Sequence, residues 1–70
     1  MIEDAIWDVL DQEVKTTPMD VETLITGMAE YFKTDRGEIE DAIISLEEQG
    51  RVYGLIFDGR PVIAPRRDRA

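Results

Sequence analysis

The sequence predicts an α+β fold, three helices followed by a two-stranded β-hairpin. Three stretches within the first fifty residues repeat apolar side chains at helical spacing. After Gly50 the pattern becomes extended, and Asp58-Gly59 separates two runs rich in strand-forming residues. Seventy residues suffice for only one hydrophobic core. We therefore expect one domain over residues 1–65 and a basic, flexible tail over residues 66–70.

The first helix is expected over residues 2–14. Its apolar stripe consists of Ile2, Ala5, Ile6, Val9 and Leu10. The Lys-Thr-Thr-Pro sequence at residues 15–18 should end it, because proline disfavours helix in the preceding residue. Trp7, Leu10 and Val14 widen the stripe, which leaves two interpretations. They can belong to the core, or they can form a dimer contact, since tryptophan is enriched at interfaces and small domains gain from association.

The second helix is expected to begin after Asp20, whose side chain can accept a hydrogen bond from an amide near Thr23. Just before it, Met19 should enter the core as an isolated extended residue. The apolar stripe of this helix consists of Val21, Leu24, Ile25, Met28 and Phe32. The periodicity stops near residues 33–34, which predicts the end of the helix there.

The third helix should open with a capping box, in which Asp35 and Glu38 each bond the other's backbone amide. Its buried face is predicted to hold Ile39, Ala42, Ile43 and Leu46. Gly50 should end the helix in the left-handed conformation that glycine adopts most easily.

The hairpin is expected to pair residues 51–57 with residues 60–65. A two-residue type I′ turn needs positive φ at both central positions, and Asp58-Gly59 suits that requirement. Pro61 and Pro65 lack amide donors, which predicts that the second strand lies at an edge. Residues 66–70 have no apolar anchor and should be mobile.

Two segments carry a resemblance to a known family: DVETLI at residues 20–25 and IEDAIISLEEQGRVY at residues 39–53. Together with the order of the elements, they resemble a winged helix-turn-helix domain over residues 2–65. The pattern is similar to archaeal and bacterial regulators and to small winged-helix modules of replication proteins. The resemblance implies that the third helix and the hairpin, or wing, bind another macromolecule. In this family that macromolecule is usually DNA and in other members a protein.

Charge is unevenly distributed along the chain. Sixteen acidic and eight basic residues give a net charge of -8. The first fifty residues hold fourteen acids and three bases, whereas the last twenty hold five arginines and two aspartates. The acidity can reflect a basic partner, or it can be the solvation habit of a salt-loving organism, because net charge reports solubility before function.

The outward face of the third helix is acidic around one apolar residue. A helix that enters the DNA major groove needs lysine or arginine to contact phosphates. Helical spacing instead places Ile44 among Glu40, Asp41, Glu47 and Glu48. These five residues are our predicted protein-interaction site, with Ile44 as an apolar anchor for a basic partner surface. The alternative is a solvated charged face, which helices often have.

Arginines suggest a second function, DNA binding by a transcription or replication regulator. Arg60 lies beside the predicted hairpin tip, where a wing would meet the phosphate backbone. The full set of candidate nucleic-acid contacts is Arg36, Arg51, Arg60, Arg66, Arg67 and Arg69. The tail arginines can also simply offset the acidic body of the protein.

Enzymatic activity is not expected. The chain has no histidine and no cysteine, so a general base would have to be a carboxylate, and these carboxylates fall on outward helical faces. No phosphate-binding loop or metal-ligand motif is present, and we expect neither cofactor nor metal. The acidic N-terminus and the lack of a long apolar run predict a cytoplasmic protein that does not enter membranes.

Overall fold

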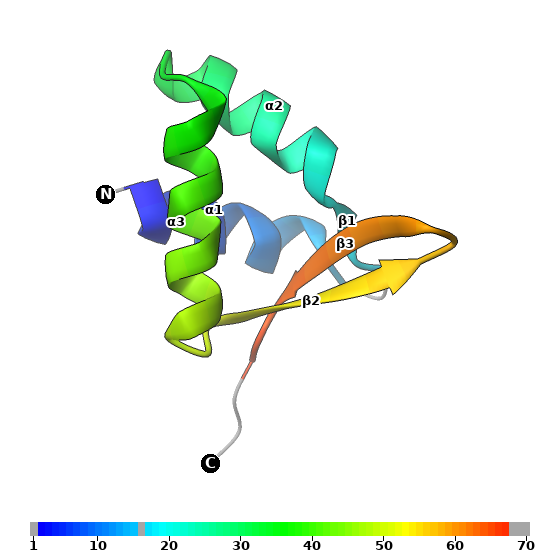
Figure 1. The fold of residues 1–70 in the computed structure, drawn as a ribbon. Coiled ribbons are helices and arrows are strands. Elements are labelled where there is room, and N and C mark those ends of the chain that lie inside the picture. Colours follow the sequence, from blue (N-terminus) through cyan, green and yellow to red (C-terminus); the bar gives the residue numbers. More distant parts are fainter. Residues whose placement is uncertain (1, 16, 68–70) are drawn as a thin grey trace.

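The computed structural model describes residues 2–15 and 17–67 and has an α+β architecture (Figure 1). It consists of three helices and one three-stranded antiparallel sheet. Along the chain the elements are α1 (Ile2–Glu13), β1 (Met19–Asp20), α2 (Val21–Phe32), α3 (Arg36–Glu48), β2 (Val52–Phe57) and β3 (Arg60–Pro65). The α+β class, the three helices and the hairpin agree with the sequence prediction. The sheet has one strand more than predicted. This strand is β1, where Met19 was expected to be an isolated extended residue.

The sheet has the order β1-β3-β2, so β3 is the central strand. The prediction that β3 lies at an edge is therefore wrong. In a hairpin with a two-residue turn, the two residues that flank the turn exchange backbone hydrogen bonds. Every second pair beyond them is also a hydrogen-bonded pair. Phe57 pairs with Arg60, so Pro61 and Pro65 both direct their nitrogens away from β2. On that other side, β1 spans only residues 62 and 63 of β3. The prolines therefore deprive neither neighbour of a donor.

The hairpin turn and the cap of α2 agree with the sequence prediction, whereas the start of α3 does not. Asp58 and Gly59 have φ of 57° and 77°, as a type I′ turn requires. The Asp20 side chain accepts a hydrogen bond from the Thr23 amide at 3.0 Å, which confirms the predicted cap of α2. The prediction of a capping box at Asp35 is wrong, because the Asp35 side chain makes no capping hydrogen bond. The Glu38 carboxylate accepts instead from the Thr34 hydroxyl.

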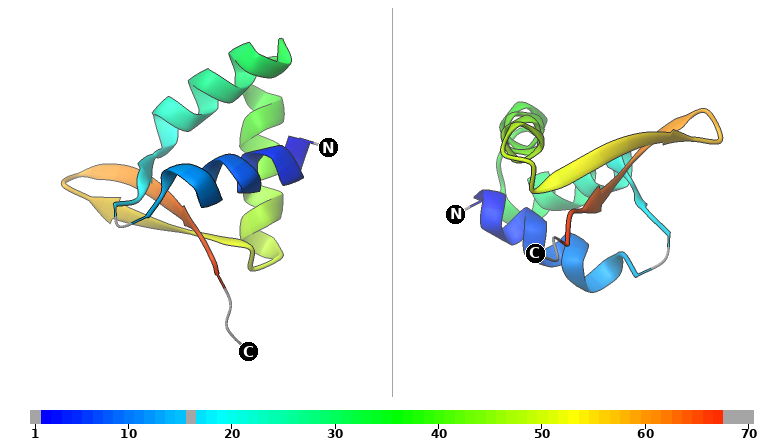
Figure 2. Two further views of the ribbon diagram at one scale, coloured as in Figure 1. Left: turned by 180° about the vertical axis from the view of Figure 1, so that it is seen from behind. Right: turned by 90° about the horizontal axis from the view of Figure 1, so that it is seen from below.

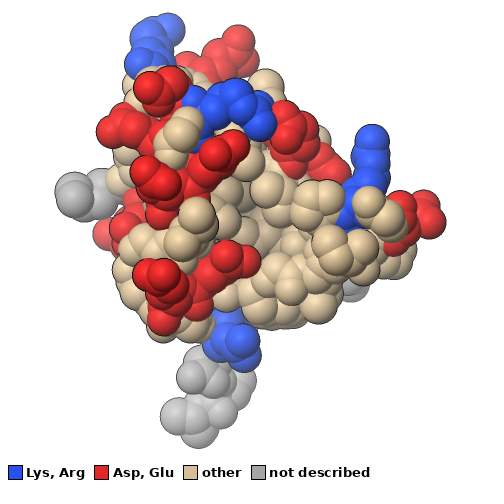
Figure 3. Space-filling view, in the orientation of Figure 1, with Lys and Arg blue, Asp and Glu red and all other residues tan. Residues whose placement is uncertain are grey.

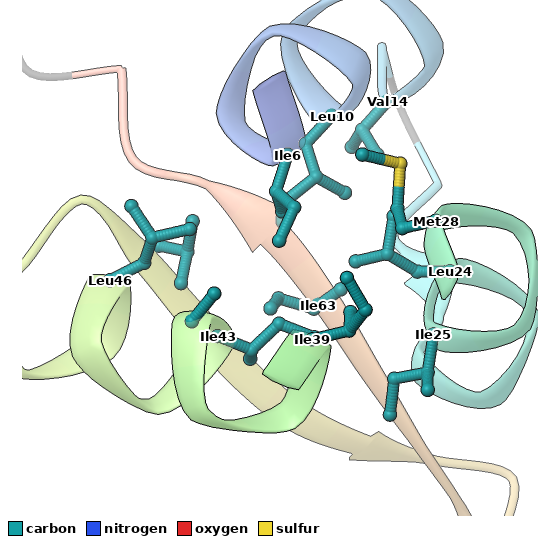
Figure 4. Packing of buried hydrophobic residues seen from close by; sticks show 13 residues of the cluster. Ile6, Leu10, Val14, Leu24, Ile25, Met28, Ile39, Ile43, Leu46 and Ile63 are labelled. Atoms are coloured by element: carbon teal, nitrogen blue, oxygen red, sulfur yellow. The ribbon is translucent and has the colours of Figure 1, made fainter. Parts of the chain in front are cut away.

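The core lies where the three helices meet β3 (Figures 2 and 4). The largest fully buried side chains come from α1, α3, β2 and β3: Ile6, Leu10, Ile39, Leu46, Val52 and Ile63. Of the two interpretations of Leu10 and Val14, the structure supports the core and not the dimer contact, since they are 0% and 5% exposed within the single chain. Their stripe is wide because α1 packs against both α3 and β3, not against a helix alone.

Residues 66 and 67, which the sequence analysis assigned to the tail, contact the body of the protein. The Arg67 guanidinium donates to the Asp11 carboxylate at 2.7 Å and to the backbone carbonyls of Asp11 and Val14. Arg66 places its guanidinium 5.4 Å from the centre of the Tyr53 ring. The predicted tail residues 68–70 lie outside the described residues.

Candidate protein-binding groove

An open groove lies between α3, the N-terminal half of α2 and the hairpin. Its volume is about 560 Å³. The residues that line it are Val21, Ile25, Glu40, Ile43, Ile44, Glu47, Gly54, Leu55, Ile56, Pro61, Val62 and Ile63. Ten of these twelve are uncharged, and the two charged residues are both acids on α3. Figure 3 shows uncharged residues over the hairpin and acidic side chains gathered over α3. The groove is thus apolar, with carboxylates on one side.

Ile44 lies on the outward side of α3, as the sequence predicted, and lines this groove. Its neighbour Ile43 is 6% exposed, whereas Ile44 is 51% exposed. The difference follows from helical geometry, since consecutive residues point about 100° apart around the axis. Both isoleucines line the groove, but Ile43 is buried in the core whereas Ile44 is half-exposed.

Gly54 leaves room for the side chain of Glu47 beside β2. A Cβ atom at this position would lie 2.9 Å from Oε2 of Glu47 and 3.7 Å from the Val62 carbonyl oxygen. The carboxylate of Glu47 therefore reaches the middle of β2. No described cation lies within ion-pair distance of it.

The acidic residues predicted around Ile44 are divided by the fold. Glu40 and Glu47 line the groove with Ile44. Asp41 lies instead at a second hollow, beside Phe32 and Glu38. Glu48 is exposed and lines neither hollow. Of the five predicted interaction residues, three come together at the groove.

The hairpin adds exposed apolar residues that the sequence analysis did not single out. Leu55, Ile56 and Phe57 are 51%, 74% and 62% exposed. Leu55 and Ile56 line the groove, and Phe57 ends β2 at the turn. The signal that could have found them was the uncharged run of residues 52–57 in a strand with only one predicted neighbour. Such an edge is rarely left without charge or proline in natural proteins.

The candidate DNA-contacting arginines do not share a surface free of acids. Within the described residues, Arg36 pairs with Glu22 at 2.8 Å, Arg51 with Asp4 at 3.2 Å and Arg67 with Asp11 at 2.7 Å. Arg60 is more loosely paired, at 3.8 Å from an Asp20 oxygen. Arg66 stacks on Tyr53, as described above, and Arg69 lies outside the described residues.

Trp7, the remaining candidate dimer residue, is half-buried against its own chain. Its indole nitrogen donates to the Arg51 carbonyl at 2.9 Å. In residues 2–15 and 17–67, no group of three or more acidic, histidine or cysteine side chains is arranged to hold a metal ion. None of the helices in this part of the chain is long and apolar enough to cross a membrane.

A scan against protein-family models and searches of curated proteins and of solved structures found no match to this chain.

Proposed function

We propose that this chain is a non-enzymatic, winged-helix regulatory or adaptor module that binds a basic protein partner in the groove between α3 and the hairpin. The observation that carries the proposal is the apolar groove itself. It joins Ile44 of α3 to Leu55 and Ile56 of β2, with Glu40 and Glu47 beside them. Contiguous exposed apolar residues with a charged border are typical of protein-interaction sites.

The arrangement of the elements supports the winged-helix assignment. The short connection between α2 and α3 covers residues 33–35, and the hairpin follows α3 directly. The winged-helix family uses its third helix and its wing for recognition, and in this chain those two elements line the same groove.

The charge supports a basic partner over an acidic one. Glu40 and Glu47 lie on the α3 side of the groove, in a chain with a net charge of -8. Charge complementarity would accelerate association and would disfavour acidic competitors. The apolar residues would provide most of the affinity once water is excluded.

DNA binding has less support. A duplex would meet the same acidic face of α3, and its phosphates would have to displace the carboxylates that now pair with Arg36, Arg51 and Arg67. The exposed Arg60 near the hairpin turn favours this alternative. Duplex DNA is therefore included in the test as a competitor.

The test compares two variants that each place an aspartate at an exposed apolar position. Ile44→Asp changes the groove, whereas Tyr31→Asp changes a 76% exposed residue that does not line it. Each protein is immobilised and used to capture proteins from an extract of the source cells. We expect wild type and Tyr31→Asp to retain the same partner, one with a lysine- or arginine-rich segment, and Ile44→Asp to lose it.

Melting curves verify that both variants fold. Capture of the same proteins by folded Ile44→Asp would reject the groove as the binding site. Tight binding of random-sequence duplex at low salt, with loss on Arg60→Ala, would favour the DNA alternative, because low salt exaggerates surface electrostatics.

A further inference from the structure

We propose that the partner enters as an extended, lysine- or arginine-containing segment that adds to the free edge of β2 as a fourth strand. This inference rests on the proposed function and specifies how the partner binds. Three independent observations support it: the edge of β2 that no described strand covers, the exposed apolar side chains on both faces of that strand, and the carboxylate of Glu47, which no described cation pairs with.

The edge of β2 is open to pairing. In the part of the chain that the structure describes, the order β1-β3-β2 leaves one side of β2 without a neighbouring strand, and the hairpin extends beyond the helices (Figures 1 and 2). Natural edge strands are usually protected by lysine, proline, a bulge or an overlying element. β2 has the sequence VYGLIF, with no charge and no proline, and it pairs with β3 without interruption over six residues.

The hairpin geometry identifies the backbone groups at that edge. Because Phe57 and Arg60 flank a two-residue turn, Tyr53, Leu55 and Phe57 exchange hydrogen bonds with β3. The alternate residues Gly54 and Ile56 then direct their amides and carbonyls away from β3. These groups would pair with the backbone of an added strand.

The exposed side chains favour a strand over a helix as the occupant. Successive residues of a strand point to opposite faces of the sheet, so Ile56 lies on one face and Leu55 and Phe57 on the other. A helix in the groove would leave Phe57, which does not line it, exposed at 62%. A strand beside β2 contacts both faces through its own alternating side chains.

Glu47 indicates the charge of the added strand. Its carboxylate reaches Gly54 in the middle of β2, and no cation from the described part of the chain pairs with it. A lysine or arginine on the groove side of the added strand would meet this carboxylate. A second copy of the chain is a poorer occupant, because two molecules of net charge -8 repel each other and β2 itself provides no cation.

The test uses short synthetic peptides with the unmodified protein. The first alternates valine and lysine. The second is identical but carries N-methyl groups on all backbone amides, so it keeps the side chains and charge but cannot donate to β2. The third replaces lysine by glutamate. Amide shifts and amide hydrogen exchange of the protein are measured by NMR with each peptide.

We expect the valine–lysine peptide to slow exchange of the Gly54 and Ile56 amides about tenfold or more. The N-methylated and glutamate peptides should leave exchange unchanged.

Ile56→Pro removes an outward amide, and Ile56→Ala removes only the side chain. Proline is tolerated where an edge N–H faces solvent. Protection of Gly54 should disappear in Ile56→Pro and persist, weakened, in Ile56→Ala.

Three outcomes would overturn the inference, and they separate it from the proposed function. If the N-methylated peptide binds as well as the first and shifts residues 40–48, the groove binds basic segments but not as strands. If neither basic peptide shifts α3 or β2 at millimolar concentration, the proposed function fails as well. If Gly54 and Ile56 are already protected in the free protein, and increasingly so at higher protein concentration, the edge is occupied by a second copy.

Discussion

The indole nitrogen of Trp7 donates a hydrogen bond to the backbone carbonyl of Arg51 at 2.9 Å, and this bond connects α1 to the start of β2. The same carbonyl accepts the Arg66 amide at 2.8 Å, so three segments of the chain meet at one oxygen. The partial burial of Trp7 is explained by this contact and requires no second subunit.

Replacement of Trp7 by phenylalanine should lower the free energy of unfolding by about 1–2 kcal/mol. The substitution retains an aromatic ring but removes the donor to a partly buried carbonyl. Urea unfolding followed by far-UV circular dichroism measures the loss. The control is Tyr31→Phe at an exposed position, which should leave stability within about 0.5 kcal/mol of wild type. Equal midpoints for the two variants would contradict the role of the indole hydrogen bond.

Truncation of two residues of α3 should lower stability by very different amounts. Leu46 is 0% exposed and Ile44 is 51% exposed. Leu46→Ala should cost about 2–5 kcal/mol, since it removes buried methyl groups and leaves a cavity. Ile44→Ala should cost about 0.5 kcal/mol or less. Thermal unfolding of both variants measures the loss of stability. Comparable losses in the two variants would mean that the outward side of α3 is misassigned.

Arg67 should stabilise the end of α1. The helix has no basic residue in its last turn, and Arg67 donates to the carbonyl and carboxylate of Asp11 and to the carbonyl of Val14 just after the helix. A cation at a helix C-terminus is favourable through both hydrogen bonding and the helix dipole. We expect Arg67→Ala to cost about 1–2 kcal/mol. Arg60→Ala, which removes a 3.8 Å pair at the surface, should cost about 0.5 kcal/mol or less. Chemical denaturation that ranks Arg60→Ala as the more damaging change would argue against the Arg67 contact.

Alanine should have opposite effects at two glycines. Gly27 lies inside α2 with open space where a Cβ would stand, so Gly27→Ala should stabilise the protein by about 0.5–1 kcal/mol. Gly50 has a φ of 76°, a left-handed conformation, and Gly50→Ala should destabilise it by about 1–2 kcal/mol. Melting temperatures that move in the same direction would refute this assignment.

Local signals in the sequence predicted the fold well. The Asp20 cap, the Gly50 helix end and the Asp58-Gly59 turn each depend on interactions within a few residues, and the structure has all three. Helical periodicity likewise separated Ile44 from the buried face of α3.

Features that depend on distant partners could not be predicted in this way. β1 consists of two residues and exists only because β3 pairs with it, so no periodic pattern marks it. Arg67 binds α1 from 56 residues away and looked like part of a free tail. The groove was predicted only in part, because Ile44 is visible from helical spacing, whereas the exposed face of β2 depends on which strand is central.

The central position of β3 also constrains when the protein can fold. β3 pairs with both other strands, and its Ile63 is only 1% exposed in the middle of the core, yet it is the last element of the domain. A nascent chain that ends before residue 60 has three helices with no sheet to close them. During synthesis the domain can therefore reach its native state only after residue 67 has left the ribosome, and until then the apolar faces of the helices remain open to chaperones.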